Sequence, residues 1–332
     1  NGQTITIEVG KTTGTITTTA PNDALNGHTP LSNAITGVSG GNYENLVADK
    51  TPVSTTVTDT VDTTDLTLTA TGTVAEGGSI TYTATLTNPA GTPVTVTLSN
   101  GSVITIEAGK TSGTVTVDAP KDDVYKDAGK VETTISTTTG GNFENLVTST
   151  APAVTTVNDT IDTSTVSLTA TANVAEGETV VYTATVTAPV TGSPLVVTLS
   201  NGQNITIAVG ETTGTVNFVA PNSPLAGGSS LSVTIDKATG GNYENLAVDG
   251  KSADTSVSDT VDTTNLNLTA TDSVAEGGSI TYTATLTNPA GTPVTVTLSN
   301  GAVITIEAGK TTGTVTVDAP KDDVYKDAGK VE

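Results

Sequence analysis

The sequence predicts an all-β protein built from tandem domains, and two observations carry this prediction. An acidic segment at residues 57–64 returns twice, so that Asp59, Asp159 and Asp259 lie 100 residues apart. Self-similarity at a fixed period is the signature of repeat proteins. Between these segments, which we call the linkers, apolar residues alternate with threonine, and this is the period of a half-buried strand. We therefore expect several β domains of similar length in one chain.

Aligning the chain on the linkers defines the domain boundaries. The alignment divides it into four stretches: 1–62, the later part of an immunoglobulin-like repeat; 63–162 and 163–262, two complete repeats; and 263–332, the first part of a repeat. Residues 266–332 nearly copy 66–132, whereas 163–262 diverges, so two repeat types alternate. We expect neither partial repeat to close a full sandwich, and we expect the chain to be a fragment of a longer protein.

Each complete repeat contains seven short apolar runs that we interpret as strands. In the repeat 63–162 these runs are 66–70, 80–86, 94–98, 104–106, 115–117, 131–136 and 147–157. Gly, Pro and Asn separate them, as in Asn88-Pro89-Ala90-Gly91. Seven short strands with turns every 8–12 residues in about 100 residues are typical of an immunoglobulin-like β-sandwich.

The odd number of strands has a geometric consequence. If successive strands alternate in direction, the chain enters a domain at one end, the entry pole, and leaves at the other, the exit pole. Tandem domains then follow end to end as a rod, with roughly 40 Å per domain. The count places the loops 89–93, 109–113 and 140–145 at the entry pole. Glu76 and the loop 122–130 belong to the exit pole, so each linker is predicted to join opposite poles of successive repeats.

Charge and composition exclude several functional classes. Acidic residues number 34 against 12 basic ones, and none of the basic residues is arginine. Nucleic acids and anionic membranes are bound by clustered positive charge, so we expect neither as a partner. With one histidine, His28, and no cysteine, the chain assembles neither a nucleophile–base pair nor a nitrogen-ligated metal site, and we predict no enzyme. The lack of cysteine suits a secreted repeat protein, and no apolar run in this fragment is long enough to insert into a membrane.

The acidic residues near each linker predict a calcium site. The fold should bring the linker acids close to one glutamate of the following repeat and one of the preceding repeat. Each close carboxylate pair is unfavourable by about 1 kcal/mol in water, and by more when buried. Calcium is bound by six to eight hard oxygens in flexible geometry. The predicted ligands are the linker acids Asp59, Asp62, Asp159, Asp162, Asp259 and Asp262, the exit-pole glutamates Glu76, Glu176 and Glu276, and the entry-pole glutamates Glu144 and Glu244. In the alternative interpretation the aspartates cap turns through backbone amides and remain solvated.

Asp122 and Asp123 are further predicted calcium ligands, in one repeat type only. Asp122, Asp123 and Asp127 recur as Asp322, Asp323 and Asp327, whereas the equivalent stretches 22–28 and 222–229 retain a single acid, Asp23, between them. Any ion held by this loop is therefore confined to one of the two repeat types.

Three motifs carry a resemblance to a known family. They are Val-Ala-Glu-Gly-Gly-Ser-Ile-Thr-Tyr-Thr-Ala-Thr-Leu at 74–86 and 274–286, Gly-Gly-Asn-Phe-Glu-Asn-Leu at 140–146, and the Asp-Thr-x-Asp-Thr linkers. With them the chain resembles the immunoglobulin-like extender repeats of giant calcium-dependent RTX biofilm adhesins of Gram-negative bacteria, the LapA-like adhesins. The resemblance implies secretion by a type I system, retention at the outer membrane on the cell surface, and a rod that calcium stiffens at its junctions.

The function we predict is therefore structural. The chain is expected to be a monomeric, calcium-rigidified spacer that projects a distal binding domain for cell adhesion and biofilm formation. Its partners are calcium ions and the neighbouring repeats of the same chain. The alternative is a ligand- or glycan-binding module of a secreted protein, because Glu76-Gly77 followed by strands and the late Asp122-Asp123 also resemble Calx-β domains.

Overall fold

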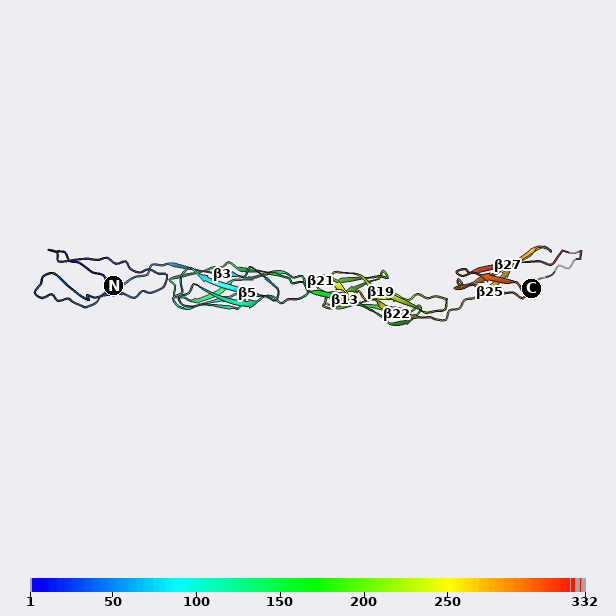
Figure 1. Ribbon diagram of the computed structural model, residues 1–332, viewed down its shortest axis with the longest axis horizontal. Helices are drawn as coiled ribbons and strands as arrows, with labels where there is room; N and C mark the ends of the chain where they lie inside the picture. The colour runs from blue at the N-terminus through cyan, green and yellow to red at the C-terminus, as the bar shows by residue number, and fades with distance from the viewer. Residues whose placement is uncertain (1, 323, 326–328, 330–332) are drawn as a thin grey trace. The chain divides into compact units, whose positions relative to one another are not determined.

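The computed structural model describes residues 2–322, 324–325 and 329, and the regular structure in them consists of strands. The chain divides into two compact units, Asn1–Asp162 and Thr163–Glu332, and each is described by itself (Figure 1). In the described part of the chain, no helix has the length and hydrophobicity that crossing a membrane requires.

The complete repeat of the first unit contains a strand at every predicted run. Its strands are β3 (Thr63–Ala70), β4 (Thr73–Ala75), β5 (Ser79–Leu86), β6 (Val94–Leu98), β7 (Val103–Ile106), β8 (Ser112–Asp118), β9 (Gly129–Thr133), β10 (Ile135–Gly140), β11 (Asn145–Thr148) and β12 (Ala153–Asn158). The last two predicted runs each divide, into β9 and β10 and into β11 and β12, because their two halves pair in different sheets. The strand structure is interrupted at Thr134 and at residues 149–152, and these interruptions let the chain pass from one sheet to the other.

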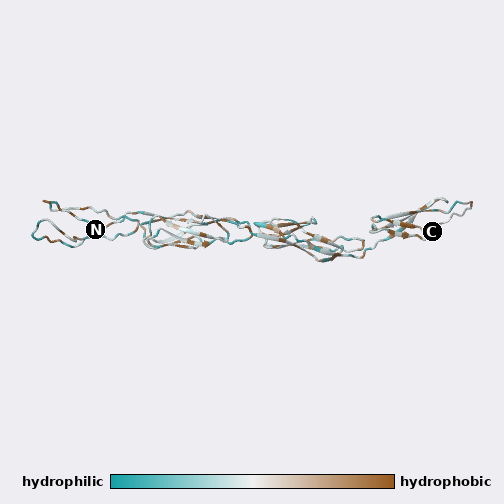
Figure 2. Cartoon of the chain, viewed as in Figure 1, coloured by the Kyte–Doolittle hydropathy of each residue, from teal (hydrophilic) through white to brown (hydrophobic). Residues whose placement is uncertain are grey.

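These strands form the two layers of a β-sandwich. One layer is the sheet β11-β3-β5-β8, and the other consists of β10-β6-β7 and β4-β12-β9. Along β5 the apolar residues point inward and the threonines outward, so that Ile80, Tyr82 and Ala84 are buried in a core shared with Val96 and Ile104 of the opposite layer. Figure 2 shows hydrophobic residues, in brown, along the strands. The predicted all-β sandwich of tandem domains is confirmed.

The first and last strands of the repeat run in the same direction. β11 pairs with β3 in parallel, with Asn145 opposite Thr63, and β12 pairs with β4 in parallel. The chain therefore enters the repeat at one pole and leaves at the other. The three loops predicted at the entry pole contact one another, because Gly91 N donates to Gly141 O at 2.9 Å and Ala90 N donates to Lys110 O at 3.0 Å.

The second unit contains a complete repeat of the same design. Its strands are β13 (Thr163–Ala170), β14 (Asn173–Ala175), β15 (Thr179–Val186), β16 (Leu195–Leu199), β17 (Asn204–Ile207), β18 (Thr213–Val219), β19 (Ser229–Val233), β20 (Ile235–Thr239), β21 (Asn245–Val248) and β22 (Ala253–Ser258). The sheets are β18-β15-β13-β21, β14-β22-β19 and β17-β16-β20, in the arrangement of the first repeat.

The two partial repeats are less enclosed. Residues 2–62 contain β1 (Leu31–Asn33) and β2 (Val53–Thr55), which pair with each other, and Val53 is 73% exposed. The last stretch contains β23 (Leu266–Ala270), β24 (Ser279–Leu286), β25 (Val294–Thr297), β26 (Val303–Ile306) and β27 (Thr312–Asp318). Leu266 is 48% exposed there, whereas the equivalent Leu66 is fully buried, because no described strand takes the place of β11 beside β23.

Candidate functional site

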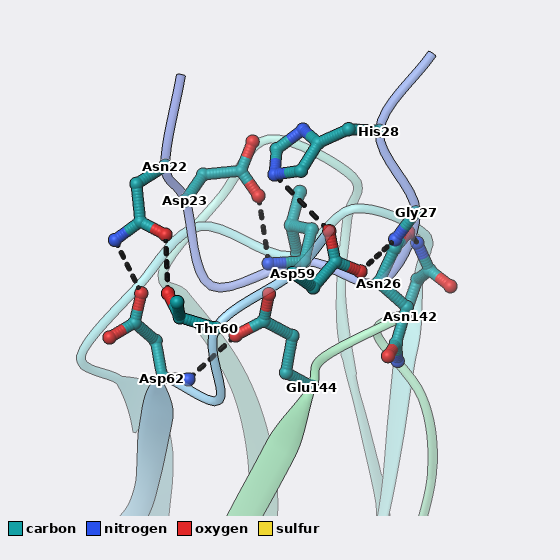
Figure 3. A network of polar contacts seen from close by, with 11 residues as sticks. Asn22, Asp23, Asn26, Gly27, His28, Asp59, Thr60, Asp62, Asn142 and Glu144 are labelled. Atoms are coloured by element: carbon teal, nitrogen blue, oxygen red, sulfur yellow. Dashed lines mark hydrogen bonds and ion pairs between the residues drawn. The ribbon is translucent and has the colours of Figure 1, made fainter. Parts of the chain in front are cut away.

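The linker of the first unit docks onto the exit pole of its own repeat (Figure 3). Asp59 Oδ2 accepts a hydrogen bond from Gly27 N at 2.7 Å, and His28 Nε2 lies 3.4 Å from the other oxygen. Asn22 Nδ2 donates to Asp62 Oδ2 at 2.9 Å. Both linker acids are therefore held by side chains and amides of the loop 22–28.

The following repeat reaches the same linker with Glu144, as predicted. This residue lies directly before β11, and its Oε2 accepts a hydrogen bond from Asp62 N at 2.6 Å (Figure 3). Its other oxygen, Oε1, is buried and has no hydrogen-bond partner among the described residues. A buried carboxylate oxygen without a donor is unfavourable, so this position favours a cation.

A leucine closes the same junction on its apolar side. Leu25 packs against the core of the repeat 63–162 and forms an antiparallel bridge with Phe143. A Cβ at Gly91 would lie 3.1 Å from Leu25 Cδ1, so the glycine makes room for the leucine. In the second unit Leu225 stands in the same relation to Gly291, also at 3.1 Å. The two contacts show that this docking is a property of the repeat pair.

The exit pole of the repeat 63–162 collects carboxylates. Glu76 follows β4, donates its backbone N–H to Asn158 O at 3.0 Å, and is only 7% exposed. Its Oε2 has no hydrogen-bond partner in the described part of the chain. Glu76 and Asp159 each place a carboxylate oxygen within 4.8 Å of the other. A hollow of about 200 Å³ beside Glu76 is also lined by Asp127 and Lys130.

The electrostatics of this pole follow from that geometry. Burial is the largest of the effects that together raise the pKa of Glu76 to about 7, and the hydrogen-bonded carboxyl of Asp127 and the charges of Asp127, Asp159 and Asp123 act in the same direction. The neighbouring carboxyl groups of this pole therefore disfavour the ionised form of Glu76, and a cation would relieve that repulsion. Hard oxygen ligands in this arrangement suit calcium.

The equivalent pole of the second unit is closed differently. Glu176 is 8% exposed, but its Oε2 accepts a hydrogen bond from Ser223 N at 3.4 Å. Asp259 Oδ2 accepts a hydrogen bond from Gly227 N at 2.9 Å. Backbone amides thus donate to Glu176 and Asp259, whereas Glu76 Oε2 and Asp159 Oδ1 of the repeat 63–162 have no donor among the described residues.

Two further predicted ligands lie in the loop that follows β8. Asp122 accepts a hydrogen bond from Thr160 Oγ1, and Asp123 Oδ1 accepts one from Tyr125 N at 2.7 Å. Asp123 therefore caps a turn. Asp162 and Glu244 are half-buried, Asp262 and Glu276 are exposed, and Asp323 lies outside the described residues.

Of three equivalent positions at the junctions, one belongs to the loop that the sequence predicts to hold an ion in one repeat type, and the other two were not singled out. They are Asp127 and its equivalents at 100-residue spacing, Gly27 and Gly227. Alignment of the repeats at 100-residue spacing places an aspartate in one repeat where its two neighbours have glycine, and the sequence alone shows this difference. In the folded loops the backbone amides of Gly27 and Gly227 point at Asp59 and Asp259, and the sequence does not show this direction.

Comparison with known proteins identifies the family of the chain. The family model described as LapA domain matches residues 1–60, 62–160, 162–260 and 262–332, which together span nearly the whole chain. No curated protein matches the chain significantly.

Proposed function

The chain belongs to the LapA domain family, as its motifs predicted, and from this membership and the linker geometry we propose that it is a calcium-stiffened extender of a cell-surface adhesin. In this function the repeats are a secreted spacer. They hold a distal binding domain away from the cell, contribute to adhesion and biofilm formation, and catalyse no reaction.

The observation that carries the proposal is the position of Glu144. It comes from the repeat that follows the linker, yet its carboxylate is bonded to the linker at Asp62 N and keeps one buried oxygen without a donor in the described part of the chain. A calcium ion at such a seam supplies positive charge that the chain lacks, since its net charge is −22. Its ligands come from successive repeats, so binding links them.

The mechanism is thermodynamic linkage. An ion that binds the docked arrangement and not the undocked one shifts the chain toward docking. At a free concentration of about ten times Kd, one site stabilises by about 1.4 kcal/mol. Affinities of about 10⁻⁴–10⁻³ M are typical of extracellular calcium modules, so calcium outside the cell suffices.

Small-angle scattering and thermal unfolding test the proposal. The full chain is measured in a chelator, in millimolar calcium, and in magnesium at the same ionic strength as a control for screening. We expect calcium to raise Tm and increase the maximum dimension of the particle, and magnesium to do so much less. Identical scattering profiles and Tm values in chelator and calcium would exclude a calcium-stiffened spacer.

A further inference from the structure

The first and last segments of each complete repeat pair with each other in parallel. In the first unit, residues 145–148 of β11 lie opposite residues 63–66 of β3, and residues 156–158 of β12 lie opposite residues 73–75 of β4. The second unit has the same two pairings, β21 with β13 and β22 with β14. We call these pairings the terminal ladders. They join the start of a repeat to its end.

Further hydrogen bonds extend the terminal ladders. At the end of β11, Ser149 N donates to Leu66 O at 2.8 Å. At its beginning, Asn145 Nδ2 donates to Thr63 Oγ1 at 3.1 Å. The equivalent contacts in the second unit are Asp249 N to Val166 O at 3.0 Å and Asn245 Nδ2 to Thr163 Oγ1 at 2.9 Å. Both repeats therefore hold their two ends together in the same way.

Tension along the chain acts on the terminal ladders in shear. The chain enters the first complete repeat at Thr63, where β3 begins, and β12 ends at Asn158 at the opposite pole. Pulling therefore draws β3 and β12 in opposite directions along their own axes. Ladder hydrogen bonds lie across the strands, so all the bonds of a ladder must stretch together before a strand slides. Strands that are pulled apart from one end lose the same bonds one after another.

We propose that each complete repeat is a force-bearing element, whose terminal ladders hold it closed when the chain is pulled at its ends. The property that they set is the rate of unfolding under tension, because forced unfolding follows this rate rather than the equilibrium free energy. This function goes beyond that of a calcium-stiffened spacer. It requires no ion, because the ladders join segments of one repeat.

The edge strand β8 provides the opposite geometry in the same repeat. It pairs with β5 alone, in antiparallel orientation, and Asp118 at its end lies opposite Ser79. The chain then continues to the exit pole, where Pro120 O accepts a hydrogen bond from Gly77 N at 2.7 Å. The next residue, Lys121, is exposed. A force between Lys121 and the linker acts across this pole, so it peels β8 from its end.

The direction of pulling tests the proposal and leaves the ladders unchanged. The chain has no cysteine, so pairs of introduced cysteines define where the handles of an optical trap attach to the full chain. The pair Val61→Cys and Ile161→Cys, at side chains 77% and 82% exposed, loads the first complete repeat in shear. The pair Lys121→Cys and Ile161→Cys loads it across the exit pole. We expect the first pair to require at least about twice the unfolding force of the second.

Two controls accompany this comparison. Each unfolding event is identified by the gain in length, which is at most about 3.6 Å for every residue released. Thermal unfolding without handles establishes that the two cysteine pairs leave the protein equally stable. A difference in force between them then reports direction and not stability.

A matched pair of substitutions tests one bond of the terminal ladders. Ser149→Pro removes the N–H that donates to Leu66 O, whereas Ser149→Ala retains it, and both lose the Oγ that accepts from Ala151 N. The position follows an edge strand, where proline is tolerated. In the shear direction and at equal force, we expect Ser149→Pro to unfold about five-fold faster than Ser149→Ala. If Ser149→Pro does not fold, the comparison of pulling directions decides.

The outcomes separate this inference from the proposed function, because all pulling is done in a chelator. Equal unfolding forces in the two directions would overturn the force-bearing ladders, and equal rates for the two Ser149 variants would contradict them as well. Neither result affects a calcium-stiffened spacer. Conversely, a chain that resists shear in a chelator, and whose Tm and scattering do not respond to calcium, retains the force-bearing repeats and excludes the calcium-stiffened spacer.

Discussion

At the scale of single residues, Glu76 is the group whose titration should be visible in stability. Burial, the carboxyl of Asp127 and the charges of Asp159 and Asp123 raise its pKa from 4.5 to about 7. The folded protein therefore binds this proton more tightly than the unfolded chain does. The resulting stability is fully present below pH 4.5 and is lost as the pH rises through about 7. In a chelator we expect Tm to fall across this window, and Glu76→Gln to lack that component.

Calcium should reverse the sign of this pH dependence. Protons and calcium compete for the Glu76 carboxylate, so stability in calcium should rise with pH over the same window. Many other acids titrate in the chain, and for this reason the measured quantity is the difference in Tm between wild type and Glu76→Gln at each pH. A difference that stays constant with pH in chelator would contradict the assignment.

The buried tyrosines offer a second test at this scale. Tyr82 hydroxyl shares a hydrogen bond with Thr133 Oγ1 at 2.8 Å, and both residues are buried. In the second repeat Val233 takes the place of the threonine, and Tyr182 hydroxyl has no hydrogen-bond partner among the residues described. Tyr82→Phe should cost about 1 kcal/mol, because it also leaves the threonine unpaired.

The matched variant Tyr182→Phe should be neutral or stabilising. It removes a buried hydroxyl that gains nothing in the folded state, and burial already raises the pKa of this tyrosine. Urea unfolding of the full chain measures both variants. Equal losses of stability in the two would show that the hydrogen bond to Thr133 contributes nothing.

At the scale of elements, the approach of β7 to β8 depends on a glycine. A Cβ at Gly113 would lie 2.3 Å from Thr105 O, and equivalent clashes, at 2.6 Å and 2.4 Å, are found at Gly214 and Gly313. The two strands pass so closely that only hydrogen fits. Gly113→Ala should therefore destabilise the protein by about 1–3 kcal/mol, as overpacking does.

Gly72→Ala is the control for this prediction. A Cβ at Gly72 meets nothing within 4 Å, and its backbone does not adopt a positive φ. The substitution should be neutral or stabilise by up to about 1 kcal/mol, because it restricts the unfolded chain. Thermal unfolding compares the two variants, and similar Tm values for both would contradict the close contact at Gly113.

At the scale of the whole molecule, Glu144 connects charge to docking. In a chelator, Glu144→Gln should raise Tm, because it removes a buried charge and keeps an acceptor for Asp62 N. In calcium the same variant should gain less stability than the wild type, because a ligand is lost. The measurement is the difference in Tm between calcium and chelator for each protein.

Glu44 provides the matched control at this scale. It occupies the same position in residues 1–62 and is exposed, so Glu44→Gln should leave the calcium-dependent change in Tm as it is in the wild type. A Glu144→Gln protein that responds to calcium as fully as the wild type would show that this glutamate is no ligand. The end-to-end arrangement of the repeats as a rod stays a prediction, and scattering measures it.

The sequence by itself determined the period, the strands and the position of Glu144 near the linker. Alternation of apolar residues and threonine reports directly which face of a strand is buried, and an odd strand count places the first and last strands in parallel. These properties are local or follow from counting. For that reason they could be inferred before any contact was known.

Only the tertiary structure decided how the poles are closed. Whether Glu76 is buried, whether Leu25 finds room at Gly91, and whether the amide at residue 27 points at Asp59 all depend on loops that are far apart in the sequence. No periodicity governs such loops, because their paths follow from packing and hydrogen bonds with distant segments. The difference between Asp127 and Gly27 is therefore plain in the sequence, but its effect on charge at the linker follows from the fold.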